Sequence, residues 1–141
     1  IIHEMSHATI FVKDSVDFNE NLATFIGDRG AEQFLISRYG KDSKEFKEYI
    51  NEDSDFLLYA DHMLRGAEKL DSLYNTFSEA DSLEEKRAMK ESLIRMIVNS
   101  LDTLALKTSE NKPSGRFKEH LPNNAYFLNF VRYQAKQDDF W

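Results

Sequence analysis

The sequence contains no cysteine, only two prolines and five glycines in 141 residues, and no long apolar run. The absence of cysteine excludes disulfides and metal sites built from thiolates. Scarce proline and glycine leave few breaks in long helices. Nothing approaches the roughly 18 consecutive apolar residues that a membrane-spanning helix needs, so the sequence predicts no transmembrane segment.

Basic residues are also in the minority, with 18 Lys and Arg against 25 Asp and Glu, a net charge of −7. Binding to a phosphate backbone needs clustered cations, whereas these are interspersed with acids. Nucleic acid is therefore not expected as a partner. A hydrophobic content of 41% with 30% charged residues is typical of a globular chain with one core.

Apolar residues recur with a period near 3.6 through most of the chain, and no convincing alternating strand is present, which predicts an all-α fold. The first two helices are expected at about 1–12 and 17–39. Two long charged helices, at about 43–77 and 82–107, are expected to form an antiparallel hairpin with solvated charged faces.

Several local signals refine these helices. Ser82 followed by Glu85 predicts a capping box at the start of the hairpin's second helix. That helix is expected to turn Met89, Met96 and Ile97 toward the core, with Leu93, Leu101 and Leu104. Both prolines lie in a predicted loop at about 108–122, and a last helix is expected from about 123.

The front of the chain carries the sequence His3-Glu4-Met5-Ser6-His7. On a helix, His3 and His7 project from one face and can share a metal ion. Imidazole pairs suit zinc and leave room for a third ligand and a water. Glu4 lies beside such a metal and can take a proton from the attacking water. The HExxH pattern is rare by chance and predicts a hydrolytic zinc site.

A third ligand is predicted at Glu20, 12 intervening residues after His7. A short turn between the first two helices would let the second run back antiparallel past the first, bringing Glu20 beside the histidines. The alternative is an ordinary exposed helical Glu. Gly27 and Gly30, inside the second helix, favour a close helix–helix approach or a kink.

The run from His3 to Gly30, HEMSHATIFVKDSVDFNENLATFIGDRG, closely resembles the bacterial predicted aminopeptidase family of gluzincin-type HExxH zinc metallopeptidases. The shared elements are HExxH, an aromatic-Val-Lys segment, FNE, AT-F and a glycine. The tail is also similar, with LPNNA at 121–125, Tyr133 and Phe140. Asp14-Ser15 stands where the family has Gly-Asp, but this departure falls in the turn.

The resemblance implies a zincin-like helical catalytic subdomain that hydrolyses a peptide substrate with Zn²⁺ held by His3, His7 and Glu20, and with Glu4 as general base. Residues 1–141 would be the C-terminal helical part of that domain. A preceding N-terminal part, absent here, would complete the cleft. A location in the bacterial cell envelope or periplasm is also expected from the resemblance alone.

Other residues receive less specific roles. Tyr133 is the first candidate for donating a hydrogen bond to the developing oxyanion, although it could equally be a core aromatic. Tyr126 is a weaker alternative on nearly the same helix face. Asn123 and Asn124 fit helix capping, or a contact with the substrate. Asn19 is expected to support the ligand Glu20.

Two function classes remain open at this point. The leading hypothesis is a zinc metallopeptidase, of which aminopeptidase activity is the form that the family resemblance implies. Endopeptidase or amidase chemistry would use the same metal site. The alternative is a non-catalytic helical scaffold or binding domain that retains a metal, which would have no need of a base at Glu4.

Overall fold

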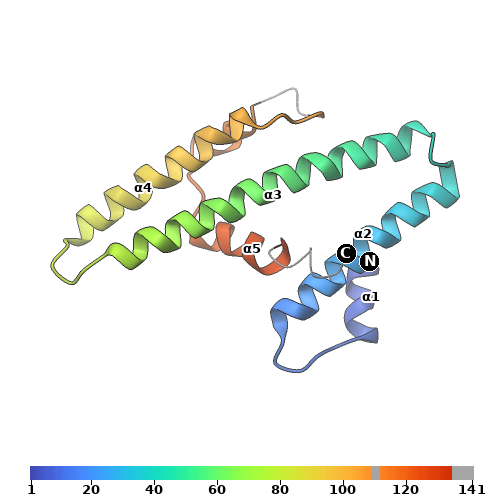
Figure 1. Ribbon diagram of the computed structural model, residues 1–141, viewed down its shortest axis with the longest axis horizontal. Coiled ribbons are helices and arrows are strands. Elements are labelled where there is room, and N and C mark those ends of the chain that lie inside the picture. The colour runs from blue at the N-terminus through green and yellow to red at the C-terminus, as the bar shows by residue number, and fades with distance from the viewer. Residues whose placement is uncertain (109–111, 135–141) are drawn as a thin grey trace. The chain divides into compact units, whose positions relative to one another are not determined.

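The computed structural model describes residues 1–108 and 112–134, and within those ranges every regular element is a helix (Figure 1). The α-helices are α1 (Ile2–Thr9), α2 (Val16–Tyr39), α3 (Lys44–Thr76), α4 (Leu83–Ser100) and α5 (Asn124–Gln134); the 3-10 helices are η1 (Leu101–Thr103) and η2 (Pro113–Phe117). The all-helical prediction is confirmed. None of the described helices has the length and apolar character needed to cross a membrane.

Two helix ends differ from expectation. The first helix ends at Thr9, not near Val12, and Ile10 is already extended with φ −133° and ψ 119°. The β-branched run around Ile10 lowers helix propensity, which accounts for the early end. The fourth helix ends at Ser100 rather than near Lys107, and the tighter turn of η1 follows it.

The chain divides into two compact units, and the boundaries fall inside α3 and α5. Unit 1 comprises Ile1–Ser54 and Val131–Trp141, and unit 2 comprises Asp55–Phe130.

Unit 2 contains a hydrophobic core. The part of α3 in this unit and α4 lie side by side as a hairpin (Figure 1), confirming that prediction. Gly66 lets them approach closely, because a Cβ there would lie 2.8 Å from Cγ2 of Ile97. The buried apolar side chains are Tyr59, Ala60, Met63, Leu70, Ile94, Ile97, Val98, Leu101, Phe117, Phe127 and Phe130.

The core-facing stripe of α4 differs from the predicted one. Met89 and Met96 are 49% and 64% exposed, whereas Ile94, Ile97 and Val98 are buried. The positions 94, 97, 98 and 101 follow the helical repeat i, i+3, i+4, i+7, and this register leaves Met96 on the outer face. The capping box of Ser82 and Glu85 is present as predicted.

The buried carboxylate of Asp55 links two segments of unit 2. Asp55 accepts hydrogen bonds from the backbone N–H groups of Lys107 and Thr108, both at 2.7 Å, and from the Thr108 hydroxyl at 2.6 Å. Desolvation opposes ionisation of Asp55, but these donors outweigh it and lower the pKa of the carboxyl below its ordinary value. The bonds attach the chain that follows η1 to the middle of α3.

Unit 1 is built differently, because α1 packs along α2 with almost no buried apolar side chain. Among its described residues the buried ones are Ser6, Asn19, Asn21 and Ala23. The two glycines of α2 allow the contact. A Cβ at Gly30 would lie 2.6 Å from Cδ1 of Ile2, and one at Gly27 would lie 3.6 Å from Cβ of His3. The predicted close approach at these glycines is confirmed.

Candidate metal centre

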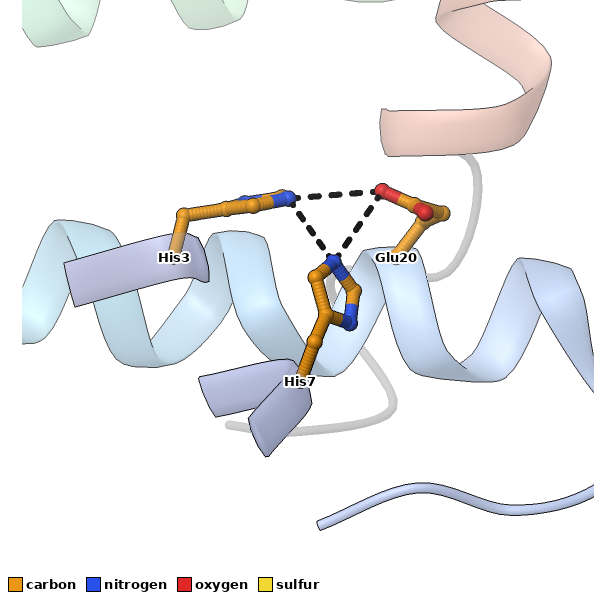
Figure 2. Close-up of side chains that lie close together, drawn as sticks. All are labelled: His3, His7 and Glu20. Carbon is orange, nitrogen blue, oxygen red and sulfur yellow. Dashed lines mark hydrogen bonds and ion pairs between the residues drawn. The ribbon is translucent and has the colours of Figure 1, made fainter. Parts of the chain in front are cut away.

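His3, His7 and Glu20 point toward one another from α1 and α2 (Figure 2). The Nε2 atoms of His3 and His7 are 3.3 Å apart. Oε2 of Glu20 lies 3.3 Å from Nε2 of His3 and 3.7 Å from Nε2 of His7. One potential ligand atom from each of the three predicted metal ligands therefore stands at a corner of a small triangle.

The size of this triangle can be compared with the requirements of zinc. Ligand atoms at about 2.0–2.2 Å from a tetrahedral Zn²⁺ lie about 3.3–3.6 Å from one another. The observed separations of 3.3, 3.3 and 3.7 Å match that spacing closely. Two imidazoles and one carboxylate also form the donor set that zinc accepts in catalytic sites. The three residues fit the metal that the sequence predicts.

The site is open to solvent. The side chains of His3, His7 and Glu20 keep 27%, 25% and 21% of their accessible surface. A metal held by three partly exposed ligands has room for a water molecule in the fourth position, as catalytic zinc sites require.

The connection between α1 and α2 sets the position of Glu20. Asn19 is buried and bonds both backbone groups of Val12: its Oδ1 accepts from the Val12 N–H at 2.8 Å, and its Nδ2 donates to the Val12 carbonyl at 2.8 Å. The turn also contains Asp14 at φ 60°, a left-handed conformation that Asp tolerates better than most residues. Asn19 thus attaches the start of α2 to the connecting segment, one residue before Glu20.

Glu4 lies on α1 next to His3, is exposed, and is not among the clustered ligand residues. Its position one residue after His3 and three before His7 places it beside the helix face that carries both imidazoles, rotated by about 100° from His3 and about 60° from His7. A carboxylate placed beside a metal site and left accessible can accept a proton from water.

Tyr133 lies close to the triad. Its ring centroid is 6.3 Å from that of His3, with the two planes inclined at 41°. Tyr126 is committed elsewhere, since its hydroxyl is 2.9 Å from that of Tyr59 and its ring packs on Phe117 and Phe130 in the core of unit 2. Of the two candidate tyrosines, Tyr133 is the one with a ring contact to His3, whereas Tyr126 packs within unit 2.

The predicted asparagines at the start of α5 have local partners. Oδ1 of Asn123 accepts from the backbone N–H of Tyr126 at 3.1 Å, which is the capping arrangement. Oδ1 of Asn124 accepts from the Tyr74 hydroxyl at 2.8 Å. Both contacts are structural, and a role for either residue toward substrate stays a prediction. Phe140 lies outside the described residues.

Two residues near the site were given no role by the sequence. Asn21 is completely buried and donates from Nδ2 to the carbonyl oxygens of Asp17, at 2.7 Å, and of Arg132, at 2.6 Å. The NEN triplet around Glu20 was the only available signal, because the partner Arg132 is 111 residues away.

Asp28 is the second such residue. Burial raises the pKa of its carboxyl, and the neighbouring charge of Asp53 raises that pKa further. Positive charge on His3 and on Arg29 acts in the opposite direction and offsets part of this rise. Nothing in the spacing of Asp28 and Asp53 distinguishes them from the many other acids of the chain.

Comparison with known proteins gives one result that bears on this site. A family model described as "Putative aminopeptidase" matches residues 1–141. No curated protein and no solved structure matches the chain. Since the family match runs from the first residue to the last, the chain belongs to this aminopeptidase family.

Proposed function

We propose that the chain carries the catalytic centre of a zinc-dependent peptidase, with His3, His7 and Glu20 as metal ligands. The observation that carries the proposal is the triangle of Nε2, Nε2 and Oε2 atoms with sides of 3.3, 3.3 and 3.7 Å. Its dimensions are those of three corners of a zinc tetrahedron. Membership of the aminopeptidase family supports peptide-bond hydrolysis as the reaction.

Each residue has a distinct part in the proposed reaction. A zinc ion bound by the triad would polarise the scissile carbonyl and activate a water molecule for attack. The Glu4 carboxylate would accept a proton from that water and later return it to the leaving amine. The Tyr133 hydroxyl would donate a hydrogen bond to the oxyanion that develops on the carbonyl.

A purely structural metal site would look different. Structural zinc is closed by four protein ligands, whereas catalytic zinc has three and keeps a position for water. Among residues 1–108 and 112–134, the potential ligands gathered at this point are three in number. Together with the accessible Glu4, this favours the catalytic proposal over a non-catalytic scaffold.

The experiment that tests the proposal replaces Glu4 with Gln. The Glu4→Gln variant should bind zinc as the wild type does, because Glu4 is not a ligand, and should hydrolyse aminoacyl and peptide substrates about 10²–10⁴-fold more slowly. The matched control is Glu45→Gln, an exposed glutamate on α3 in the same unit, which should leave both properties unchanged. Zinc content and kcat are measured on the same preparations.

Unchanged hydrolysis in Glu4→Gln would remove Glu4 from the mechanism. Loss of zinc together with activity would show that Glu4 belongs to the ligand set. Absence of zinc binding in the wild type would refute the proposed metal centre.

A further inference from the structure

We infer that Asn21 is a positioning residue that holds Tyr133 beside the metal triad. The inference rests on the proposed function, in which Tyr133 acts on the developing oxyanion. Asn21 does not touch the reacting groups in this account. It acts through the backbone of the residue that precedes Tyr133.

The amide nitrogen of Asn21 donates to two carbonyl groups. The exposed fraction of Asn21 is 0%, and Nδ2 lies 2.7 Å from the carbonyl oxygen of Asp17 and 2.6 Å from that of Arg132. An amide nitrogen has two hydrogens, so both are used. The first bond fixes the amide against its own helix, and the second holds α5 at the peptide bond that leads into Tyr133.

The position of Asn21 relative to Glu20 explains the arrangement of the site. Successive helical residues are rotated by about 100°, so Asn19 and Asn21 are separated by about 200° and point to opposite sides of α2. Asn19 holds the segment after α1, and Asn21 holds α5. Glu20 therefore follows one residue that is bonded to the α1–α2 connection and precedes another that is bonded to the last turn of α5.

A second polar link joins α2 to the last turn of α5, and it is weaker. Nε of Arg132 lies 4.0 Å from Oδ1 of Asp17, and both side chains are more than half exposed. Ion pairs of this kind contribute roughly 0–1 kcal/mol and are screened by salt. The bond from Asn21 is part-buried and its donor side chain is completely buried, so water and salt screen it less than they screen the exposed ion pair.

The consequence for catalysis follows from the geometry. An oxyanion donor works only at hydrogen-bond distance from the reacting oxygen, and a displacement of about 1 Å can cost about 10² in rate. Releasing α5 from Asn21 should therefore lower kcat. It should leave zinc affinity and KM largely unchanged, because the three ligands lie on α1 and α2.

The test compares Asn21→Leu, similar in size but unable to donate, with Tyr133→Phe and with the double variant. Each single variant should lower kcat about 10²-fold with zinc affinity kept. The double variant should be no slower than Tyr133→Phe, because the two changes remove the same contribution. Asn99→Leu, an exposed asparagine on α4, is the control for an Asn-to-Leu change and should match the wild type.

A second readout does not depend on activity. The rings of Tyr133 and His3 are close enough for a nuclear Overhauser effect between their protons in the metal-free wild type. That signal should disappear in Asn21→Leu. Asn21→Asp, which keeps the shape but replaces the donor nitrogen with an acceptor, should behave in the same way and is used if the leucine variant does not fold.

Two results would overturn the inference. One is a ring-to-ring signal that persists in both Asn21 variants. The other is a multiplicative loss of kcat in the double variant, or a fall in zinc affinity parallel to that of kcat, since these indicate a general structural role. If the wild type neither binds zinc nor hydrolyses peptides, the proposed function fails, while the ring-to-ring signal still decides whether Asn21 places Tyr133.

Discussion

The two compact units of this chain are stabilised in different ways. Unit 2 has eleven buried apolar side chains in one cluster, and its buried carboxylate, Asp55, has a lowered pKa because three donors surround it. Unit 1 buries three polar side chains and one alanine among its described residues. Its acids Asp28 and Asp53 have raised pKa values, for which burial is the main cause.

The stability of the two units therefore has different sources. Hydrophobic burial stabilises unit 2 without reference to any ligand. Unit 1 is held by the amides of Asn19 and Asn21, by the close approach at Gly27 and Gly30, and by charges placed near one another. A zinc ion bound by His3, His7 and Glu20 would stabilise unit 1, because the free energy of binding adds to that of folding.

The largest expected loss of folding stability comes from a substitution in the core of unit 2. Leu101 is completely buried, and Leu101→Ala should lower the free energy of unfolding by about 2–5 kcal/mol while zinc affinity stays within about threefold of the wild type. The matched change in unit 1, Phe34→Ala, removes a larger side chain that is 61% exposed and should cost under about 0.5 kcal/mol. Chemical denaturation measures both. Equal losses of unfolding free energy in the two variants would contradict the conclusion that hydrophobic burial stabilises unit 2 more than unit 1.

Zinc binding should stabilise unit 1 and leave the stability of unit 2 nearly unchanged. At a free concentration of 100 times the dissociation constant, zinc adds about 2.7 kcal/mol to the stability of the state that binds it. Hydrogen exchange should therefore slow in α1 and α2 and change little in α4 and η1. Peptide-level mass spectrometry with and without zinc gives the comparison. Slower exchange in unit 2 alone would contradict the assignment of the metal to unit 1.

Asp55 provides a pH test of unit 2. Since its folded-state pKa is lowered, its contribution to stability is present above the unfolded pKa, near 3.9, and is lost as the pH falls through the folded value. Asp55→Asn should cost about 1.5–3 kcal/mol at neutral pH and flatten the stability profile below about pH 4. Thermal denaturation across pH 2–7 measures this dependence of stability on pH. If the variant loses stability below about pH 4 as the wild type does, Asp55 is not the cause of that loss.

The contribution of Asp53 to folding stability should depend on pH in the opposite direction to that of Asp55. It should also be the smallest of these effects. Burial, and then the charge of Glu32, raise the pKa of Asp53, so the folded state binds the proton more tightly than the unfolded state. Stability contributed by this group is therefore lost as the pH rises above about 4. Asp53→Asn should raise the melting temperature of the metal-free protein slightly at neutral pH. A lower melting temperature would mean that the charge of Asp53 is stabilising.

The helices and the juxtaposition of His3, His7 and Glu20 can be predicted from the sequence because both depend on short spacings. His3 and His7 are one helical turn apart, and Glu20 follows after a connection short enough to let α2 run back past α1. The end of α1 was misplaced because the β-branched residues after it continue the apolar pattern. Met96 was assigned to the core because a periodic stripe leaves its exact register open by about one residue.

The hydrogen bond of Asn21 to Arg132 and the burial of Asp28 could not be predicted in this way. Asn21 acts on a carbonyl 111 residues away, and only the tertiary arrangement of α2 and α5 brings the two together. A buried asparagine inside a helix gives no periodic signal, and Asp28 is one of 25 acidic residues. Long-range placement of single polar groups therefore had to come from the structure.

The most direct test of the central claim is a zinc titration of the metal-free protein and of its Glu20→Gln variant. The account predicts one zinc per chain for the wild type and a loss of at least about 10-fold in affinity for the variant, because a charged ligand is replaced by a neutral amide. Glu32→Gln, which alters a glutamate of the same helix whose partner is Arg29, is the control and should retain wild-type affinity. Equal zinc affinity in the wild type and Glu20→Gln would contradict the assignment of His3, His7 and Glu20 as the metal centre.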